Sequence, residues 1–128
     1  MSKPNIPTEE QEQMALFEWA ETMVHINPEL RWLYAIHNGL RLSVGMRVKA
    51  KRLGTKKGVA DVCLPVARGG YHGLYIELKR QKGGVFSEEQ MGFVQFCDDQ
   101  GYLYLGCAGW GIASRNILLY LSMRHEPH

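Results

Sequence analysis

Cysteine is scarce in this chain, and long apolar runs are missing. The three cysteines, Cys63, Cys97 and Cys107, are odd in number and widely spaced, which argues against a disulfide framework and against zinc-ligand spacing. We therefore expect buried free thiols. No apolar run approaches the ~20 residues of a membrane span, and Met1 to Glu12 has no signal-peptide core. These absences predict a cytoplasmic protein without a membrane segment.

Acidic residues are nearly missing from the middle of the chain. Residues 1–29 contain six acids and one base, whereas residues 30–82 contain twelve bases and two acids, Asp61 and Glu77. A basic block is often only a solvated face. A block that lacks compensating acids around two isolated carboxylates instead favours binding of a polyanion such as nucleic acid.

Those two acids lie in a segment that predicts a β-hairpin around a glycine-rich turn at Gly69. Side chains of a strand alternate between its two faces, so Leu74, Ile76 and Leu78 share one face and Glu77 lies on the other. A pairing in which residue numbers sum to 138 places Asp61 directly opposite Glu77, with Cβ atoms ~5 Å apart.

Lys79 projects from the same face as Glu77, about 6.6 Å further along the strand. Two close carboxylates repel unless a cation lies between them, and Mg²⁺ is the usual cation for a site with one or two carboxylates. The alternative is a surface strand with a cross-strand ion pair. The apolar character of both strands favours the metal site.

The spacing of Asp61, Glu77 and Lys79 resembles the core of the PD-(D/E)xK nuclease fold. The wider pattern resembles the VRR-NUC family within it, from about Glu9 to Leu105. The blocks that carry this resemblance are Gly58-Val-Ala-Asp61, Tyr71-His-Gly-Leu-Tyr-Ile-Glu77-Leu-Lys79, Gly84-Val-Phe-Ser-Glu-Glu-Gln90 and Gly101-Tyr102. One departure is Ala60, where the family usually has proline before the catalytic Asp.

The resemblance implies an α/β fold of the restriction-endonuclease-like type, with a mixed sheet of about four strands flanked by helices. It implies that Asp61, Glu77 and the backbone carbonyl of Leu78 bind Mg²⁺ or Mn²⁺. Lys79 is then expected to orient or deprotonate a water molecule, or to stabilise the pentacovalent phosphate. By this analogy, hydrolysis leaves a 5′-phosphate and a 3′-hydroxyl.

Two capping-box patterns predict helices that begin at Thr8 and at Ser87. Glu9, in the first of these helices, matches an acid that the family often adds to the site, with Glu10 and Glu12 as weaker candidates. Acids in a first turn also simply favour the helix dipole. Gln90 has two interpretations: it completes the cap of Ser87, and the resemblance places it beside Lys79 or a catalytic water.

Several basic and polar residues before Asp61 are candidate DNA contacts. Asn38 and Arg41 follow a predicted strand, Trp32 to Ile36, and either bind a phosphate or, for Asn38, only form a turn. A helix predicted over Leu42 to Leu53 and the segment after it contain no aromatic residue, so backbone contacts to a duplex fit better than base stacking. The candidate cations there are Arg47, Lys49, Lys51, Arg52, Lys56 and Lys57.

Length and pattern predict one domain over residues 1–128, with residues 1–7 as a flexible arm. A strand, Tyr102 to Ala108, and an apolar helix, Trp110 to Met123, complete it. The resemblance to small stand-alone, phage-type members implies a metal-dependent endonuclease for branched DNA, foremost a Holliday-junction resolvase, acting in the host cytoplasm without a small-molecule cofactor. Two symmetric cuts require two sites, so we expect a homodimer, with the last helix as a candidate interface. The alternatives are a flap, fork or nonspecific duplex nuclease, and a catalytically silent nucleic-acid-binding module.

Overall fold

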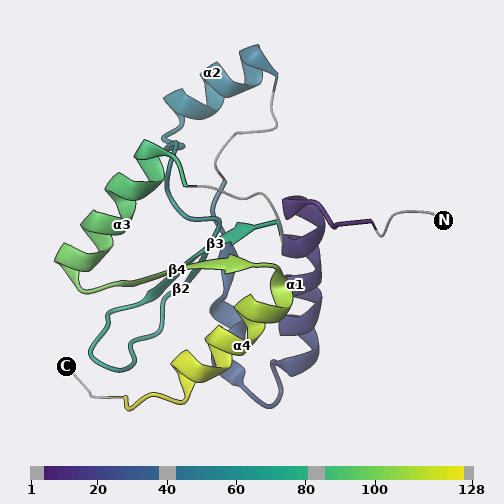
Figure 1. Cartoon of the computed structure of the whole chain (residues 1–128), viewed down its shortest axis with the longest axis vertical. Helices are drawn as coiled ribbons and strands as arrows, with labels where there is room; N and C mark the ends of the chain where they lie inside the picture. Colours follow the sequence, from purple (N-terminus) through teal and green to yellow (C-terminus); the bar gives the residue numbers. More distant parts are fainter. Residues whose placement is uncertain (1–4, 38–42, 81–85, 126–128) are drawn as a thin grey trace.

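The structure is a computed structural model that describes residues 5–37, 43–80 and 86–125. A small sheet lies at its centre, with helices on both faces (Figure 1). The elements in chain order are α1 (Glu9–Met23), the 3-10 helix η1 (Pro28–Trp32), β1 (Tyr34–Ala35), α2 (Val44–Arg52), β2 (Val62–Leu64), β3 (Leu74–Lys79), α3 (Glu88–Gln100), β4 (Leu103–Ala108) and α4 (Trp110–Leu121). The predicted α/β fold class, a mixed sheet of about four strands flanked by helices, is confirmed.

The four strands follow the chain order across the sheet, β1-β2-β3-β4. β1 with β2 and β2 with β3 are antiparallel, whereas β3 and β4 are parallel. Val62 pairs with Ile76 and Leu64 pairs with Leu74, so the predicted register with a sum of 138 is confirmed. The parallel pair is joined by α3, as a crossover connection requires.

One face of the sheet forms the main core. Leu74, Ile76 and Leu78 are each at most 1% exposed and belong to a cluster that includes Leu16 of α1 and Ile117 of α4. Figure 1 shows α1 and α4 beside each other on this side, with α3 across the sheet from them. α3 covers the face of the sheet that carries Glu77.

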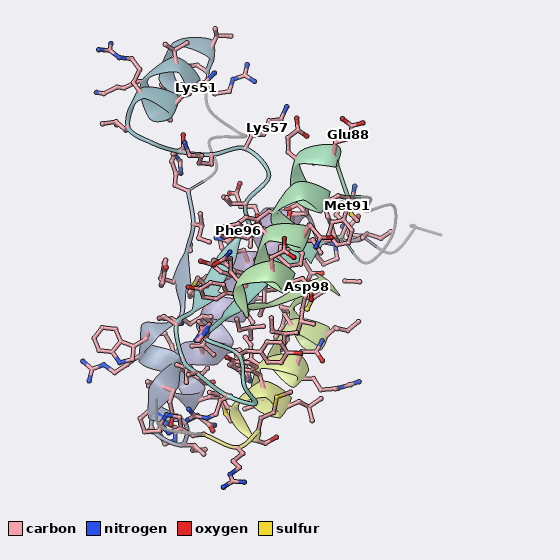
Figure 2. The ribbon with its side chains drawn as sticks, turned by 90° about the vertical axis from the view of Figure 1, so that its left-hand side faces the viewer. Lys51, Lys57, Glu88, Met91, Phe96 and Asp98 are labelled. Atoms are coloured by element: carbon pink, nitrogen blue, oxygen red, sulfur yellow. The ribbon has the colours of Figure 1, made fainter. Side chains whose placement is uncertain are left out.

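α3 contacts its face of the sheet through Phe93, whose ring meets that of Tyr75 edge-to-face at 5.1 Å between centroids. Met91 and Phe96, which Figure 2 labels on α3, are 53% and 52% exposed, whereas Cys97 is fully buried. The helix therefore turns Phe93 and Cys97 toward the sheet.

Capping explains where α1 and α3 begin. Thr8 and Ser87 each accept a hydrogen bond from the third helical residue, and the side chain of that residue, Gln11 or Gln90, accepts one from the backbone N–H of the cap. α3 ends at Gly101, whose φ of 83° is a conformation that glycine adopts without steric cost. Both predicted capping boxes are confirmed.

Some strand boundaries differ from the prediction. β2, the first strand of the predicted hairpin, comprises only Val62–Leu64 and begins one residue after Asp61. The strand expected over Trp32 to Ile36 reduces to Tyr34–Ala35, because Pro28 starts a 3-10 helix that includes Trp32. β1 and β2 are therefore short strands that pair through only two residues each.

α2 extends away from the sheet, at the top of Figure 1. Of its residues only Ala50 is buried. Its cations, Arg47, Lys49, Lys51 and Arg52, are exposed. Among the described residues, no helix is long and apolar enough to cross a membrane. The three cysteines are buried free thiols, as predicted.

Candidate active site

The register of β2 and β3 brings Asp61 and Glu77 onto the same face of the sheet. The backbone N–H of Asp61 donates to the carbonyl of Ile76 at 3.0 Å, which holds Asp61 against β3 although it lies one residue before the start of β2. The backbone N–H of Leu78 donates to Oδ2 of Asp61 at 2.7 Å. This bond fixes the carboxylate of Asp61 against β3, beside Glu77.

Gln90 links Glu77 to Lys79. Its Nε2 donates to Oε1 of Glu77 at 2.6 Å, and its Oε1 accepts from Nζ of Lys79 at 3.3 Å. The same Oε1 accepts from the backbone N–H of Ser87 at 2.7 Å. Gln90 therefore completes the helix cap, as predicted, and also contacts two of the candidate site residues.

Lys79 and Glu77 also form an ion pair, with Nζ 3.6 Å from Oε1. The side chains are 16% and 6% exposed. Nζ of Lys79 lies 5.3 Å from the centre of the Phe86 ring, which bounds the ammonium group on another side. The ammonium group is thus held between a carboxylate, an amide and an aromatic ring.

Burial makes the two carboxyl groups weak acids. Asp61 is 9% exposed and Glu77 is 4% exposed. Burial, followed by the charge of Asp61, raises the pKa of Glu77 to about 8, although Lys79 opposes the shift. Burial also raises the pKa of Asp61, against the lowering effect of the Leu78 N–H. Without a cation, the pair therefore holds a proton near neutral pH.

The donor set fits a hard divalent cation. Oε2 of Glu77 is buried and, within residues 5–37, 43–80 and 86–125, no hydrogen-bond donor reaches it. The carbonyl of Leu78 is directed to the same side of β3 as that of Ile76, toward Asp61, because alternate carbonyls of a strand share a side. Two carboxylates and a carbonyl suit Mg²⁺ or Mn²⁺ with water completing the shell.

A larger protein-only metal centre is not found. In the described part of the chain, no group of three or more His, Cys, Asp or Glu side chains is arranged to hold a metal ion. Glu9 does approach the pair, since its charge raises the pKa of both Asp61 and Glu77. It lies at the start of α1 and is half-buried. Glu9 therefore faces the site without adding a third ligand to a closed cluster.

The other two acids of that turn have different environments. Glu12 is 1% exposed, and its Oε1 accepts a hydrogen bond from the backbone N–H of Trp110 at 3.4 Å. Trp110 opens α4, whose cap residue Gly109 offers no side-chain bond. Glu10 is exposed. Of the three candidates, Glu9 is the one whose charge acts on both carboxyl groups.

Sequence reasoning missed three residues around the pair: Tyr104, Gly106 and Phe86. Gly106 lies opposite Glu77 in the sheet, and Tyr104 lies two residues earlier on the same strand. A Cβ on Gly106 would collide with the Phe86 ring, so glycine is required for this ring to lie over the sheet in its present position. Alternation along Leu103–Ala108 indicates that Tyr104 and Gly106 share a face, but not which face meets Glu77.

Six of the predicted DNA contacts lie in described parts of the chain, on α2 and on the segment after it. Figure 2 shows Lys51 on α2 and Lys57 on the segment that leads from α2 toward the start of α3, where Glu88 lies. Lys57 forms a 3.9 Å ion pair with Glu89, and both side chains are largely exposed. Lys56 is exposed as well. Asn38 and Arg41 lie outside the described residues.

Comparison with solved structures finds a chain described as "VRR_NUC domain protein". It superposes with a TM-score of 0.73 at 22% sequence identity, over 91% of this chain and 90% of that chain. No protein-family model and no curated protein sequence matches the chain. The chain has the fold of a VRR_NUC domain protein.

Proposed function

We propose that this chain, which has the fold of a VRR_NUC domain protein, is a metal-dependent, structure-selective DNA endonuclease. One observation carries the proposal: two buried carboxylates, Asp61 and Glu77, share a sheet face with an ammonium group held by Gln90. Mg²⁺ or Mn²⁺ bound there would polarise a phosphodiester oxygen and lower the pKa of a bound water. We take residues 1–128 as one such domain.

Each side chain has a distinct task in this proposal. The Leu78 N–H holds the carboxylate of Asp61 through Oδ2, and this carboxylate would be a ligand of the cation. Gln90 occupies Oε1 of Glu77, which leaves Oε2 for the same purpose. Lys79 is then placed to orient the attacking water or to offset the charge on the phosphate. Glu9 adds negative charge that favours a dication.

The exposed cations supply the contacts to DNA. α2 lacks acids and displays four bases, only Ala50 among its residues is buried, and the helix extends away from the sheet (Figure 1). Lys and Arg that neutralise phosphates give sequence-independent, salt-dependent affinity. α2 is therefore suited to bind the phosphate backbone of a duplex that adjoins the site. Asn38 and Arg41 stay candidate phosphate contacts.

We further propose that the preferred substrate is a four-way junction and that the active form is a homodimer. One chain provides one site, whereas symmetric resolution of a junction requires two. Ile112 and Leu119, seven residues apart on α4, are 45% and 57% exposed. An apolar strip of this kind supports a symmetric contact between two copies. Phage origin and action in the host cytoplasm belong to the same proposal.

The decisive experiment compares cleavage of a labelled four-way junction, a flap and a linear duplex, with Mg²⁺, Mn²⁺ or EDTA. Paired symmetric cuts in the junction, abolished by EDTA and by Asp61→Ala, are expected. Equal cutting of all substrates retains the nuclease and rejects junction selectivity. Binding without any metal-dependent cutting replaces the enzyme with a silent nucleic-acid-binding module. Monomeric behaviour at micromolar concentration argues against paired resolution.

A further inference from the structure

A cavity of about 370 Å³ lies next to the candidate active site, between β1, the segment after α2, and α3. Its volume falls within the range of ~300–1,000 Å³ that is typical of small-ligand pockets. The site residues Asp61, Glu77 and Lys79 do not line it. The cavity is therefore a separate feature of the same side of the sheet.

Aromatic rings form the principal walls of this cavity. Tyr34, Tyr75 and Phe93 come from β1, β3 and α3. The pairings Tyr34 with Cys63 and Cys63 with Tyr75 place both tyrosines on one cross-strand row. Phe93 holds Tyr75 in an edge-to-face contact with centroids 5.1 Å apart. Tyr34 is 50% exposed and so presents its ring to incoming molecules.

Polar groups line the remaining side. His37, Thr55 and Lys56, whose side chains carry an imidazole, a hydroxyl and an ammonium group, are among the lining residues. Lys56 is exposed and lies four residues after the end of α2, in the basic part of the chain. An apolar and aromatic lining with a few polar groups at one side suits a flat, heterocyclic ligand that is attached to a negative charge.

The cavity and the candidate metal site are neighbours along β3. Tyr75 precedes Glu77 by two residues on β3, a separation of about 6.6 Å along the strand. Ile36, which also lines the cavity, donates its backbone N–H to the carbonyl of Asp61 at 2.8 Å. A ligand in the cavity therefore lies within about one nucleotide of the reacting phosphate.

We propose that this cavity binds a single unstacked nucleobase of the DNA strand, with the adjoining phosphate against Lys56. The proposal rests on the proposed nuclease function and specifies how that site selects its substrate. Base stacking on aromatic rings tolerates any sequence, and polar groups meet the edge of the base. Extruding a base costs least where pairing is already broken, so the cavity favours branch points over uninterrupted duplex.

The test measures binding without cleavage, in EDTA, to two probes: a four-way junction with 2-aminopurine at the branch point, and a linear duplex with 2-aminopurine at its centre. Wild-type protein should change the fluorescence of the branch-point base and bind the junction more tightly. Tyr34→Ala should abolish the fluorescence change and weaken junction binding about fivefold or more, with little effect on the duplex. Tyr34→Phe, which keeps the ring, should behave as wild type.

Two further variants distinguish an effect of the cavity from a general electrostatic effect, and a folding check excludes loss of structure. Trp32→Ala removes an aromatic ring that is 59% exposed on the preceding segment and does not line the cavity, and it should change neither signal. Lys51→Gln removes an exposed α2 cation and should lower the affinity for both probes equally. Circular dichroism verifies that each variant is folded.

Unchanged junction affinity and an unchanged fluorescence signal in folded Tyr34→Ala would overturn the base pocket while leaving the nuclease proposal intact. An equal loss of affinity for both probes in Tyr34→Ala would also overturn the base pocket. A wild type that binds neither probe would remove the DNA assignment and the pocket together. Absence of cleavage in Mg²⁺ alongside the expected binding signals would reject the nuclease and keep the pocket.

Discussion

Oε2 of Glu77 and Oη of Tyr104 are both buried and, in the part of the chain that the structure describes, neither has a hydrogen-bond partner. The two groups share an environment, because burial and then the charges of Glu77 and Asp61 raise the pKa of the Tyr104 hydroxyl. A buried carboxylate oxygen is an acceptor and a neutral tyrosine hydroxyl is a donor. A hydrated cation beside Glu77 would satisfy both, since the cation would bind Oε2 and a water molecule bound to it would donate a hydrogen bond to Oη of Tyr104.

Tyr104→Phe tests this relationship. Removing an unsatisfied buried hydroxyl should leave the metal-free protein as stable as wild type or more stable, by up to about 1–3 kcal/mol. The affinity for Mn²⁺ should fall, because a group that orients metal-bound water is lost. Calorimetric titration with Mn²⁺ and thermal unfolding with and without Mn²⁺ measure the two effects separately.

Tyr75→Phe is the matched control for that change. Tyr75 pairs with Tyr104 across the parallel strands and lies on the same face, but its pKa is raised by burial and by Cys63, Tyr102 and Cys97 rather than by the carboxylates. The Tyr75→Phe variant should bind Mn²⁺ with the affinity of wild type. Equal Mn²⁺ affinity of the Tyr104 variant and wild type would show that the hydroxyl has no part in the site.

Gln90 can be separated from its role as a helix cap by comparison with Gln11. Each glutamine is the third residue of a capped helix and accepts from the cap N–H, Gln11 at 2.9 Å and Gln90 at 2.7 Å. Gln90→Ala and Gln11→Ala should each lower the free energy of unfolding by about 0.3–1.5 kcal/mol. Gln90→Ala alone should lower cleavage, by about 10–100-fold, because only Gln90 orients Glu77 and Lys79.

Denaturant unfolding and single-turnover cleavage at saturating Mg²⁺ supply the two measurements. A cleavage loss of similar size in both variants would show that Gln90 acts only through the stability of α3. Ser87→Ala adds a further check, since Ser87 caps the same helix without contacting the carboxylates. Its cleavage rate should stay near that of wild type.

The hairpin that carries the site could be predicted from sequence because its signals are local. Alternation in Leu74–Lys79 and the glycine turn define both the face and the register, so the juxtaposition of Asp61 with Glu77 follows from about twenty neighbouring residues. Gln90 came from a local capping pattern together with the family resemblance. These are contacts in which periodicity and turn geometry leave few alternatives.

The residues that were missed depend on long-range packing. Tyr104 reaches the site only through the parallel register between β3 and β4, which the α3 crossover sets and no turn specifies. Phe86 precedes the cap of α3, where an apolar residue usually packs on its own helix, but here its ring covers Gly106. The shortness of β2 has a similar origin, because β1 offers it only two partners, Tyr34 and Ala35.

The metal-free protein should lose stability as the pH rises from about 4.5 to about 8. Burial and the charge of Asp61 raise the pKa of Glu77 from 4.5 to about 8. Between those values, folded Glu77 keeps a proton that the unfolded chain has released, so the folded state binds more protons. The free energy of unfolding therefore falls across this window and levels off above it. Asp61, whose pKa is also raised, contributes with the same sign.

Urea unfolding at several pH values in EDTA measures this slope. Glu77→Gln should flatten it, because the amide does not titrate and needs no proton to be buried. Saturating Mn²⁺ should reverse the trend in wild type, since the cation binds the ionised carboxylates and competes with protons. A flat pH profile of the metal-free wild type would contradict the assignment of Glu77 as a buried, weakly acidic group.

Glu9 and Glu12 should prove to have different roles despite lying one turn apart on α1. Glu9→Gln removes a charge that raises the pKa of both Asp61 and Glu77. The fall in the free energy of unfolding with rising pH should therefore occur at lower pH than in wild type. Mn²⁺ binding should weaken, because less negative charge faces the dication. Glu10→Gln, an exposed neighbour, is the control and should change neither property.

Glu12→Ala should instead lower the free energy of unfolding by about 1–3 kcal/mol, because the N–H of Trp110 at the start of α4 loses a buried acceptor. Mn²⁺ affinity should remain close to that of wild type at temperatures where the variant is folded. Calorimetry and denaturant unfolding on the Glu9 and Glu12 variants test both statements together. If Glu12→Ala loses Mn²⁺ affinity while Glu9→Gln keeps it, then Glu12 is the acid that serves the site, and the role assigned to Glu9 is wrong.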